Sequence, residues 1–294
     1  MVVEFEKNQL YTATTFNQPP KSLNWHIFMK CNYSCKFCFK TYAGYKSSLQ
    51  PNSKEYLSDE KVKIILKKLK EAKVEKITFA GGEPTLYPYL PEVLKLAKEM
   101  GFVTMIVTNS SLLTDMYLDK IQDHIDYVKL SIDSSYEGIQ KELGRGKGDH
   151  IKKTLEAGNR LKNRKIKVMM NTVVTLKNIN DDMSGIVEKL SPVRWKVFQA
   201  LPEKGENDNF KWWCSKDQFE SFIKRHEKYD PVAEPNNLMR GSYVIMDPIG
   251  RFMNDETGQY HYSDSILYTD VLKALGQVGW NYEKFKERGG EYEW

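Results

Sequence analysis

The sequence predicts an α/β fold, a partial (β/α)6 TIM-like barrel with N- and C-terminal extensions. Short β-rich runs alternate with longer amphipathic segments, six of these runs precede residue 200, and the regular alternation stops after Phe198. Because strands joined through helices form right-handed βαβ units, we expect the six runs to form one parallel sheet. Catalytic groups should then lie at the carboxyl ends of the strands.

The expected strands are short runs rich in β-branched and aromatic residues, which fit a pleated and half-buried surface. In chain order they are Leu23–Phe28, Glu75–Phe79, Val103–Val107, Tyr127–Ile132, Lys167–Val174 and Arg194–Phe198.

Amphipathic segments separate these runs and are expected to be helices. Ser58 has the side chain of a helix N-cap, and apolar residues follow it at positions 62, 65, 66 and 69, which is the spacing of one helix face. The same pattern recurs at Leu90–Met100, His150–Leu161 and Ile179–Leu190.

We expect three regions: an N-terminal extension at residues 1–20, the barrel core at 21–200, and a C-terminal extension at 201–294 that closes the barrel mouth. The polar, turn-rich segment Gly44–Lys54 should be an exposed loop and a candidate lid. The elements expected within the C-terminal extension are a loop at Asn207–Phe210, a helix at Ser215–His226 and a strand or hairpin at Ser242–Met253.

The composition is that of a globular protein. The chain is 40% hydrophobic and 28% charged, which excludes an intrinsically disordered polypeptide. A formal charge of +5 suits a polyanionic small substrate as well as nucleic acid, and no long basic tract favours nucleic acid. The chain has neither the pattern of a signal peptide nor the roughly 18 apolar residues of a membrane-spanning helix. We expect a cytoplasmic monomer that binds neither membrane nor nucleic acid.

Three of the four cysteines, Cys31, Cys35 and Cys38, follow the first expected strand with the spacing C-x3-C-x2-C. A structural zinc site needs four ligands, so it would also require Cys214 or a histidine. Three thiolates suit a [4Fe-4S] cluster better, because they hold three irons and leave the fourth open. The spacing therefore indicates a metal site with an open position.

With Phe37 between its last two cysteines, this motif resembles the signature of the radical S-adenosylmethionine superfamily. The second expected strand ends in Gly81-Gly82-Glu83-Pro84, which is similar to the GGEP motif of that superfamily. The resemblance implies a [4Fe-4S] cluster on the three cysteines and S-adenosylmethionine as cofactors. It also implies that Gly81 and Gly82 let the backbone approach the methionine amino group and that Glu83 helps to bind it.

Further polar residues lie where this superfamily contacts S-adenosylmethionine. Asn109 follows the third expected strand, and Arg145 lies between two glycines as a cation suited to the methionine carboxylate. The fourth expected strand contributes Ser131, Asp133 and Ser134. The resemblance implies that these residues bind the cofactor.

Several blocks resemble viperin-like enzymes in particular, from about Leu23 to Tyr292, and the most specific of them is Pro192–Gln199. The resemblance implies a nucleoside triphosphate substrate that is converted to its 3′-deoxy-3′,4′-didehydro form in an antiviral role. It also implies an electron donor such as flavodoxin or ferredoxin. The animal members of the family use CTP.

Basic residues on the expected strands are compatible with a triphosphate. The two-residue period of a strand places Arg194 and Lys196 on one face, and Lys76 on the second strand can join them. Buried cations need anions, which a triphosphate would supply; the alternative is structural ion pairs with Asp or Glu inside the barrel. Asn171 is a further candidate substrate contact. Tyr243, which matches a family tyrosine, is the candidate donor of the final electron and proton.

Two departures from the animal enzymes leave the nucleobase open. Met169 stands where those enzymes carry a lysine, and Phe28 stands where they carry a small hydroxyl residue. We expect CTP or UTP, with GTP as a further candidate. Two alternatives remain: a different radical S-adenosylmethionine enzyme that acts on peptide or RNA, and a non-catalytic iron-sulfur or zinc protein.

Overall fold

The computed structural model describes residues 20–41 and 57–294. The expected loop Gly44–Lys54 therefore lies outside the described residues, and so does nearly all of the expected N-terminal extension.

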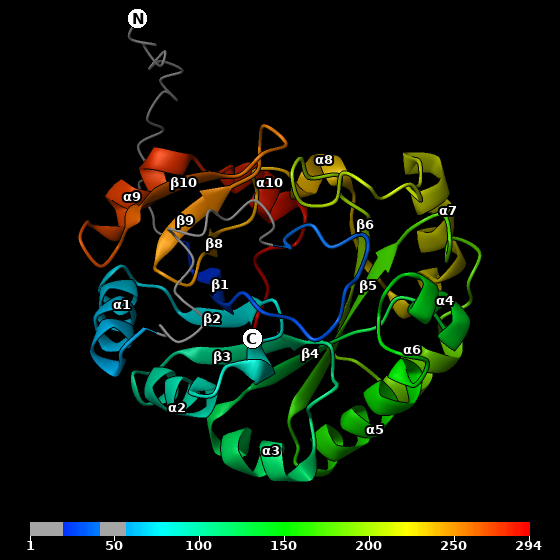
Figure 1. The fold of residues 1–294 in the computed structure, drawn as a ribbon, viewed down its shortest axis with the longest axis horizontal. Helices are drawn as coiled ribbons and strands as arrows, with labels where there is room; N and C mark the ends of the chain where they lie inside the picture. Colours follow the sequence, from blue (N-terminus) through cyan, green and yellow to red (C-terminus); the bar gives the residue numbers. More distant parts are fainter. Residues whose placement is uncertain (1–19, 42–56) are drawn as a thin grey trace, which may run out of the picture.

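The core is a parallel sheet that curves around a central space (Figure 1). Its six strands follow one another in chain order, each paired in parallel with the next. They are β1 (Ser22–Phe28), β2 (Lys76–Gly81), β3 (Val103–Thr108), β4 (Tyr127–Ser131), β5 (Lys167–Val174) and β6 (Arg194–Gln199). The predicted partial (β/α)6 barrel is confirmed, and each expected strand is present with ends that differ by at most one or two residues.

Helices cover the outer side of this sheet (Figure 1). They are α1 (Asp59–Glu71), α2 (Leu90–Glu99), α3 (Asp115–Ile121), α5 (His150–Asn163) and α6 (Ser184–Leu190), with the shorter α4 (Glu137–Glu142), η1 (Pro84–Leu86) and η2 (Gln122–His124) in the connections. Ser58 caps α1 as predicted, because its side chain accepts a hydrogen bond from the Lys61 backbone N–H. The apolar face of α1 packs into the main hydrophobic core.

One helix boundary differs from the prediction. Helix α6 begins at Ser184, whereas the apolar spacing placed its start at Ile179. The side chain of Asn178 explains the difference: its Oδ1 accepts the Thr175 N–H at 2.7 Å, and its Nδ2 donates to the Val173 carbonyl at 2.9 Å. These bonds hold the chain in turns before the helix begins.

The C-terminal region extends the same sheet at both edges. Strand β7 (Val232–Glu234) pairs in parallel with β6, and β8 (Ile245–Met246) pairs in parallel with β1. Strands β9 (Arg251–Asn254) and β10 (His261–Ser265) continue antiparallel beyond β8. The remaining elements are α7 (Lys216–Arg225), η3 (Glu227–Tyr229), α8 (Asn236–Met239), α9 (Val271–Val278) and α10 (Tyr282–Glu287). Over the described residues the sheet has ten strands and stays open between β10 and β7.

Two expectations for this region agree with the structure. The helix expected at Ser215–His226 is α7 with a capping box on Ser215, and the hairpin expected at Ser242–Met253 is β8 with β9. None of the described helices is long and apolar enough to cross a membrane.

Candidate active site

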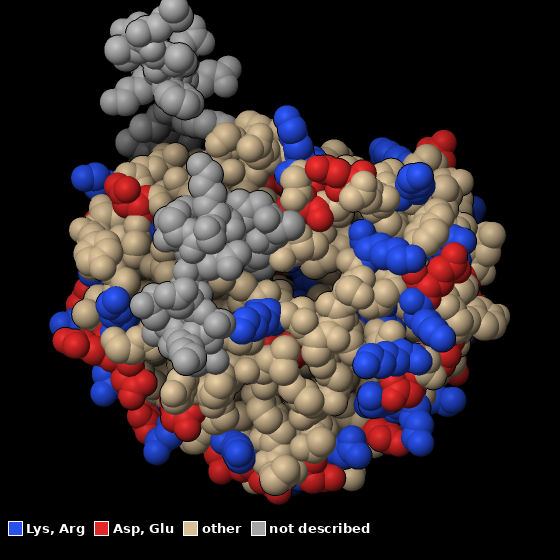
Figure 2. Space-filling view, viewed as in Figure 1, with Lys and Arg blue, Asp and Glu red and all other residues tan. Residues whose placement is uncertain are grey.

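One cavity runs through the inside of the curved sheet, from the cysteines at the carboxyl ends of the strands to basic residues near their amino ends. Figure 2, in the same view as Figure 1, shows a hollow near the middle of the molecule. Most charged side chains in this view lie toward the outer edge of the molecule. The predicted site residues that line this cavity are Cys31, Cys35, Phe37, Cys38, Lys76, Gly81, Gly82, Glu83, Asn109, Ser131, Asp133, Arg145, Asn171, Lys196 and Tyr243. Ser134 and Arg194 are not among its lining residues: Ser134 is buried and donates to Asp181, and Arg194 lines a second pocket beside the amino ends of the strands.

The cysteine loop is held by backbone contacts with the segment after α4. The Ser34 N–H donates to the Gly144 carbonyl at 3.2 Å, and the Lys36 N–H donates to the Leu143 carbonyl at 2.9 Å. Gly144 has φ +84°, and a Cβ at this position would lie 2.1 Å from the Ser34 carbonyl oxygen. The loop can approach this closely only because residue 144 lacks a side chain.

The three cysteine side chains lie in different environments at one end of the cavity. Burial raises the pKa of Cys35 to about 12 and that of Cys38 to about 11. Cys31 Sγ faces polar donors, the Tyr33 N–H at 3.4 Å and Asn109 Nδ2 at 3.8 Å. These thiols would carry protons until a metal displaces them.

The arrangement of the cysteines distinguishes between kinds of metal site. Within residues 20–41 and 57–294, no three His, Cys, Asp or Glu side chains form a group that could hold a single metal ion. The thiolates of a [4Fe-4S] cluster each bind a separate iron, so they need to line one space rather than converge on one point. Cys214 contributes nothing to this space: it is buried in the main hydrophobic core, and its Sγ donates to the Val174 carbonyl at 3.4 Å. The three cysteines therefore fit an iron-sulfur cluster better than a zinc ion.

Glu83 is fixed by donors on both carboxylate oxygens. Its Oε1 accepts from Thr85 Oγ1 at 2.5 Å and Thr108 Oγ1 at 2.7 Å, and its Oε2 accepts from the Asn109 N–H at 2.7 Å. Burial raises the pKa of Glu83, and these hydrogen bonds oppose that rise by stabilising the charged form. An anchored carboxylate on the cavity wall suits a cationic amino group.

Gly81, before Glu83, has φ +129°, and a Cβ here would lie 2.1 Å from the Phe28 carbonyl oxygen. The glycines of this motif thus also let β2 pass close to the chain that leads from β1 into the cysteine loop, in addition to any contact with a cofactor.

Arg145 is buried and already paired. Its Nε donates to Asp133, whose other oxygen accepts the Val173 N–H at 2.9 Å, and its guanidinium lies 5.5 Å from the Phe37 ring centre. The partnership with Asp133 raises the pKa of Arg145 against the opposing effect of burial. Arg145 therefore has one carboxylate partner, Asp133, and its remaining N–H donors lie beside the cysteines.

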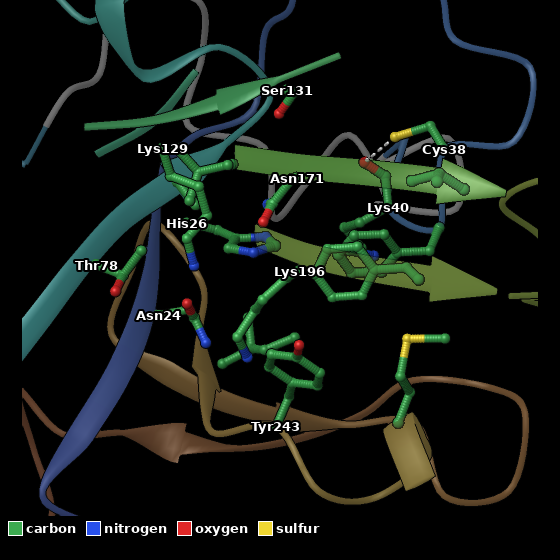
Figure 3. Close-up of a pocket in the computed structure, with 18 of the residues that line it drawn as sticks. Asn24, His26, Cys38, Lys40, Thr78, Lys129, Ser131, Asn171, Lys196 and Tyr243 are labelled. Atoms are coloured by element: carbon green, nitrogen blue, oxygen red, sulfur yellow. Dashed lines mark hydrogen bonds between the residues drawn. The ribbon is translucent and has the colours of Figure 1, made fainter. Parts of the chain in front are cut away.

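The basic residues occupy the deeper part of the cavity, where Figure 3 shows Lys129, Asn171 and Lys196 on neighbouring strands with Tyr243 below them. Lys196 pairs with the buried Glu234 of β7, which also accepts from Tyr243 Oη. Lys196 thus forms an ion pair inside the barrel and also lines the cavity.

No carboxylate pairs with Lys76 or Arg194 in the described part of the chain. Lys76 Nζ donates to Tyr292 Oη at 2.6 Å, and Arg194 donates to the Gly289 carbonyl at 2.6 Å. The pKa of Lys76 falls to about 7, mainly because the side chain is buried and also because Lys196 and Arg194 lie nearby. These buried cations therefore lie close to one another with too few carboxylates to balance their charge.

Sequence reasoning missed three residues that line the deeper cavity, Lys129, Arg288 and Tyr292, and also Glu234, the partner of Lys196. Lys129 carried a signal, since a lysine between Val128 and Leu130 interrupts an otherwise apolar strand. The Arg288 guanidinium lies 3.6 Å from the Glu234 carboxylate. This contact forms only when the chain folds, so no local sequence pattern indicates it. No local pattern marks Glu234 or Tyr292, which reach the site through the C-terminal extension.

Comparisons with known proteins agree with this geometry. A family model described as the radical SAM superfamily matches residues 25–190. The chain is 41% identical over 286 residues to an S-adenosylmethionine-dependent nucleotide dehydratase of Flammeovirga pacifica, covering 93% of this chain and 96% of that relative. It is 36% identical over 290 residues to the S-adenosylmethionine-dependent nucleotide dehydratase RSAD2 of Danio rerio, covering 94% of this chain and 78% of that one.

A solved structure shares the fold at low sequence identity. The structure of Streptococcus suis SuiB bound to S-adenosylmethionine matches with a TM-score of 0.68, over 92% of this chain and 68% of that one, at 16% identity. With the family match and the relatives above, the chain belongs to the radical SAM superfamily of enzymes, whose cofactors are a [4Fe-4S] cluster and S-adenosylmethionine, and within it to the viperin-like nucleotide dehydratases.

Proposed function

We propose that this enzyme converts a nucleoside triphosphate, CTP or UTP, to its 3′-deoxy-3′,4′-didehydro analogue. The observation that carries the proposal is that one cavity joins the three cysteines to a group of buried lysines with too few carboxylates to balance them. A nucleoside triphosphate bound along this cavity would place its phosphates on the lysines and its ribose toward the cysteines.

Cys31, Cys35 and Cys38 would hold the cluster, and Glu83 would bind the amino group of S-adenosylmethionine. Phe37, Gly81, Gly82, Asn109, Ser131, Asp133 and Arg145 are the proposed remaining contacts of this cofactor, whereas Ser134, which does not line the cavity, is not proposed as a direct contact. When bound, the reduced cluster and S-adenosylmethionine together supply a 5′-deoxyadenosyl radical that removes the ribose 4′ hydrogen. The protein's own contribution is to hold the cofactor and the ribose together and to exclude water.

On the substrate side, Lys76, Arg194 and Lys196 would bind the phosphates and Asn171 the sugar. Asn171 Oδ1 is buried and has no hydrogen-bond partner within the described chain, so an acceptor is ready for a ligand hydroxyl. Buried cations in a dry cavity attract a triphosphate more strongly than exposed ones would.

Tyr243 is the proposed source of the last electron and proton: the proton leaves with the 3′-hydroxyl as water, the electron completes the product, and a tyrosyl radical remains to be reduced. Its phenol stays protonated, because burial and the adjacent Glu234 carboxylate raise its pKa well above the ordinary value. A partner such as flavodoxin or ferredoxin would replenish the electrons.

The test is anaerobic reconstitution of the cluster, reduction, and measurement of 5′-deoxyadenosine with S-adenosylmethionine and each of CTP, UTP, GTP and ATP. We expect CTP or UTP to stimulate cleavage, and the dehydrated nucleotide to appear in the same reaction. Stimulation by none of the four would overturn the proposal.

Single cysteine variants control this test. Changing Cys31, Cys35 or Cys38 to Ala should abolish cleavage, whereas Cys214→Ala should retain it, because Cys214 packs in the hydrophobic core away from the cavity lining. An inactive but folded Cys214→Ala variant would favour a four-ligand metal site instead. An antiviral role and a cytoplasmic location remain predictions from the sequence.

A further inference from the structure

Lys129 of β4 is a buried cation that the assignments above leave unused. Its side chain lines the cavity with only 7% of its surface exposed. Within the described part of the chain it forms no hydrogen bond and no ion pair, whereas Lys196 has Glu234 and Lys76 has Tyr292. A buried ammonium group without a partner is costly, so the position calls for an anion that the protein itself does not provide.

The neighbours of Lys129 increase this need. It belongs to a basic cluster, defined as Lys76, Lys129, Arg194, Lys196 and Arg288, whose members act on one another electrostatically. Burial is the main cause of a pKa of Lys129 far below the ordinary value, and Lys196 and Lys76 lower it further. Glu234 is the carboxylate that opposes this effect, and Lys196 and Arg288 already contact it. The cluster therefore has room for further negative charge.

The sheet register places Lys129 of β4 beside Met169 of β5. Lys129 pairs directly with Met169 across β4 and β5, and Met169 in turn pairs with Arg194 of β6. Partners in register project to the same face of a sheet from strands about 4.8 Å apart. A lysine at position 169 would thus project from the neighbouring strand on the same face of the sheet as Lys129.

We infer that Lys129 is a phosphate-binding residue of the substrate site, and that it adds a cation from β4 to those proposed on β2 and β6. The inference rests on the proposed function, since the ligand it names is the triphosphate of the nucleotide substrate.

The test compares Lys129→Met with a double variant, Lys129→Met/Met169→Lys, that moves the lysine across the register pair. Loss of one charged contact should raise the KM for the nucleotide by about tenfold or more while S-adenosylmethionine cleavage at saturating nucleotide stays near that of the parent enzyme. The double variant should recover most of this loss. Lys95→Met is the matched control, because Lys95 is exposed on α2, outside the cavity lining.

A second measurement separates phosphate binding from a structural role. Lys129→Met removes an unpaired buried charge, so the Tm of the nucleotide-free protein should rise and the further rise on adding nucleotide should shrink. A lower Tm without nucleotide together with an unchanged KM would overturn the inference. Inactivity of the parent enzyme with all four nucleotides would instead refute the proposed function, so the two failures are distinguishable.

Discussion

Lys76 is the residue whose charge depends most clearly on its surroundings. Its pKa falls from 10.5 to about 7 because it is buried beside Lys196, Arg194 and Arg288. Between these two pH values the unfolded chain holds a proton on Lys76 that the folded, nucleotide-free chain has lost. Stability must rise with pH wherever the unfolded state binds more protons.

We therefore predict that Lys76 adds to the free energy of unfolding of the nucleotide-free protein as the pH rises from 7 toward 10, and that Lys76→Met makes the pH profile less positive in slope by this contribution. Denaturant unfolding at several pH values measures this slope. Lys95→Met should leave the slope unchanged, because Lys95 lies on the helix surface. A parallel profile for Lys76→Met would mean that Lys76 keeps its proton in the folded chain.

Individual residues were predictable from the sequence where the chemistry is contained in a short segment. The three cysteines and Gly81–Glu83 lie within such segments, and the fold brings them to one end of one cavity. Glu234 and Tyr292 were not predictable, because their contacts with Lys196 and Lys76 span 38 and 216 residues. Contacts between residues so far apart in the sequence depend on how the C-terminal extension folds, so no local pattern predicts them.

At the scale of elements, strands were predicted better than helix ends. A buried strand is marked along its whole length by its residue types, so β1 to β6 agree with their expected runs. The start of α6 depends on what one side chain does: Asn178 bonds to the backbone of Thr175 and Val173 and delays the helix. Apolar spacing contains no information about such a bond.

The position of the cysteine loop is sensitive to a single substitution at Gly144. We predict that Gly144→Ala lowers both the free energy of unfolding and the iron bound after reconstitution, because the new Cβ would meet the Ser34 carbonyl at 2.1 Å. Gly148→Ala is the matched control: Gly148 also has a positive φ, of +105°, but nothing lies within 4 Å of the Cβ it would gain. The control should cost only the backbone penalty, about 1–2 kcal/mol, and bind iron normally. Equal iron binding by the two variants would show that this contact does not position the cysteines.

At the scale of the whole molecule, the C-terminal region is part of the sheet itself. It supplies β7 and β8, which pair with β6 and β1 and so extend both edges of the core sheet. It also brings its last residues back to the middle of the molecule, as Figure 1 shows. Alternating strands and helices in the sequence predicted the core, but strand addition at two distant edges depends on contacts that only the complete chain forms.

The last residues close the cavity at the amino ends of the strands. The Tyr292 ring centre lies 3.9 Å from Lys76 Nζ and 4.1 Å from the Arg194 guanidinium, and the Trp294 ring centre lies 4.1 Å from Lys76 Nζ. Both rings also pack against Met105, Tyr127 and Met169. The two aromatic side chains thus cover Lys76 and Arg194 at this end of the cavity.

We predict that removing residues 292–294 weakens nucleotide binding about tenfold, because water then reaches Lys76 and screens its attraction for the phosphates. Titration calorimetry with the nucleotide and S-adenosylmethionine measures the loss, and cleavage without nucleotide should not change, since the cysteine end lies far along the cavity. Replacing Tyr292 and Trp294 by Leu keeps an apolar cover but removes the rings, so its affinity should fall between those of the parent and the truncated enzyme. If truncation also lowers the basal cleavage in proportion, the tail supports the whole fold; if it leaves the affinity unchanged, the rings contribute nothing to the phosphate site.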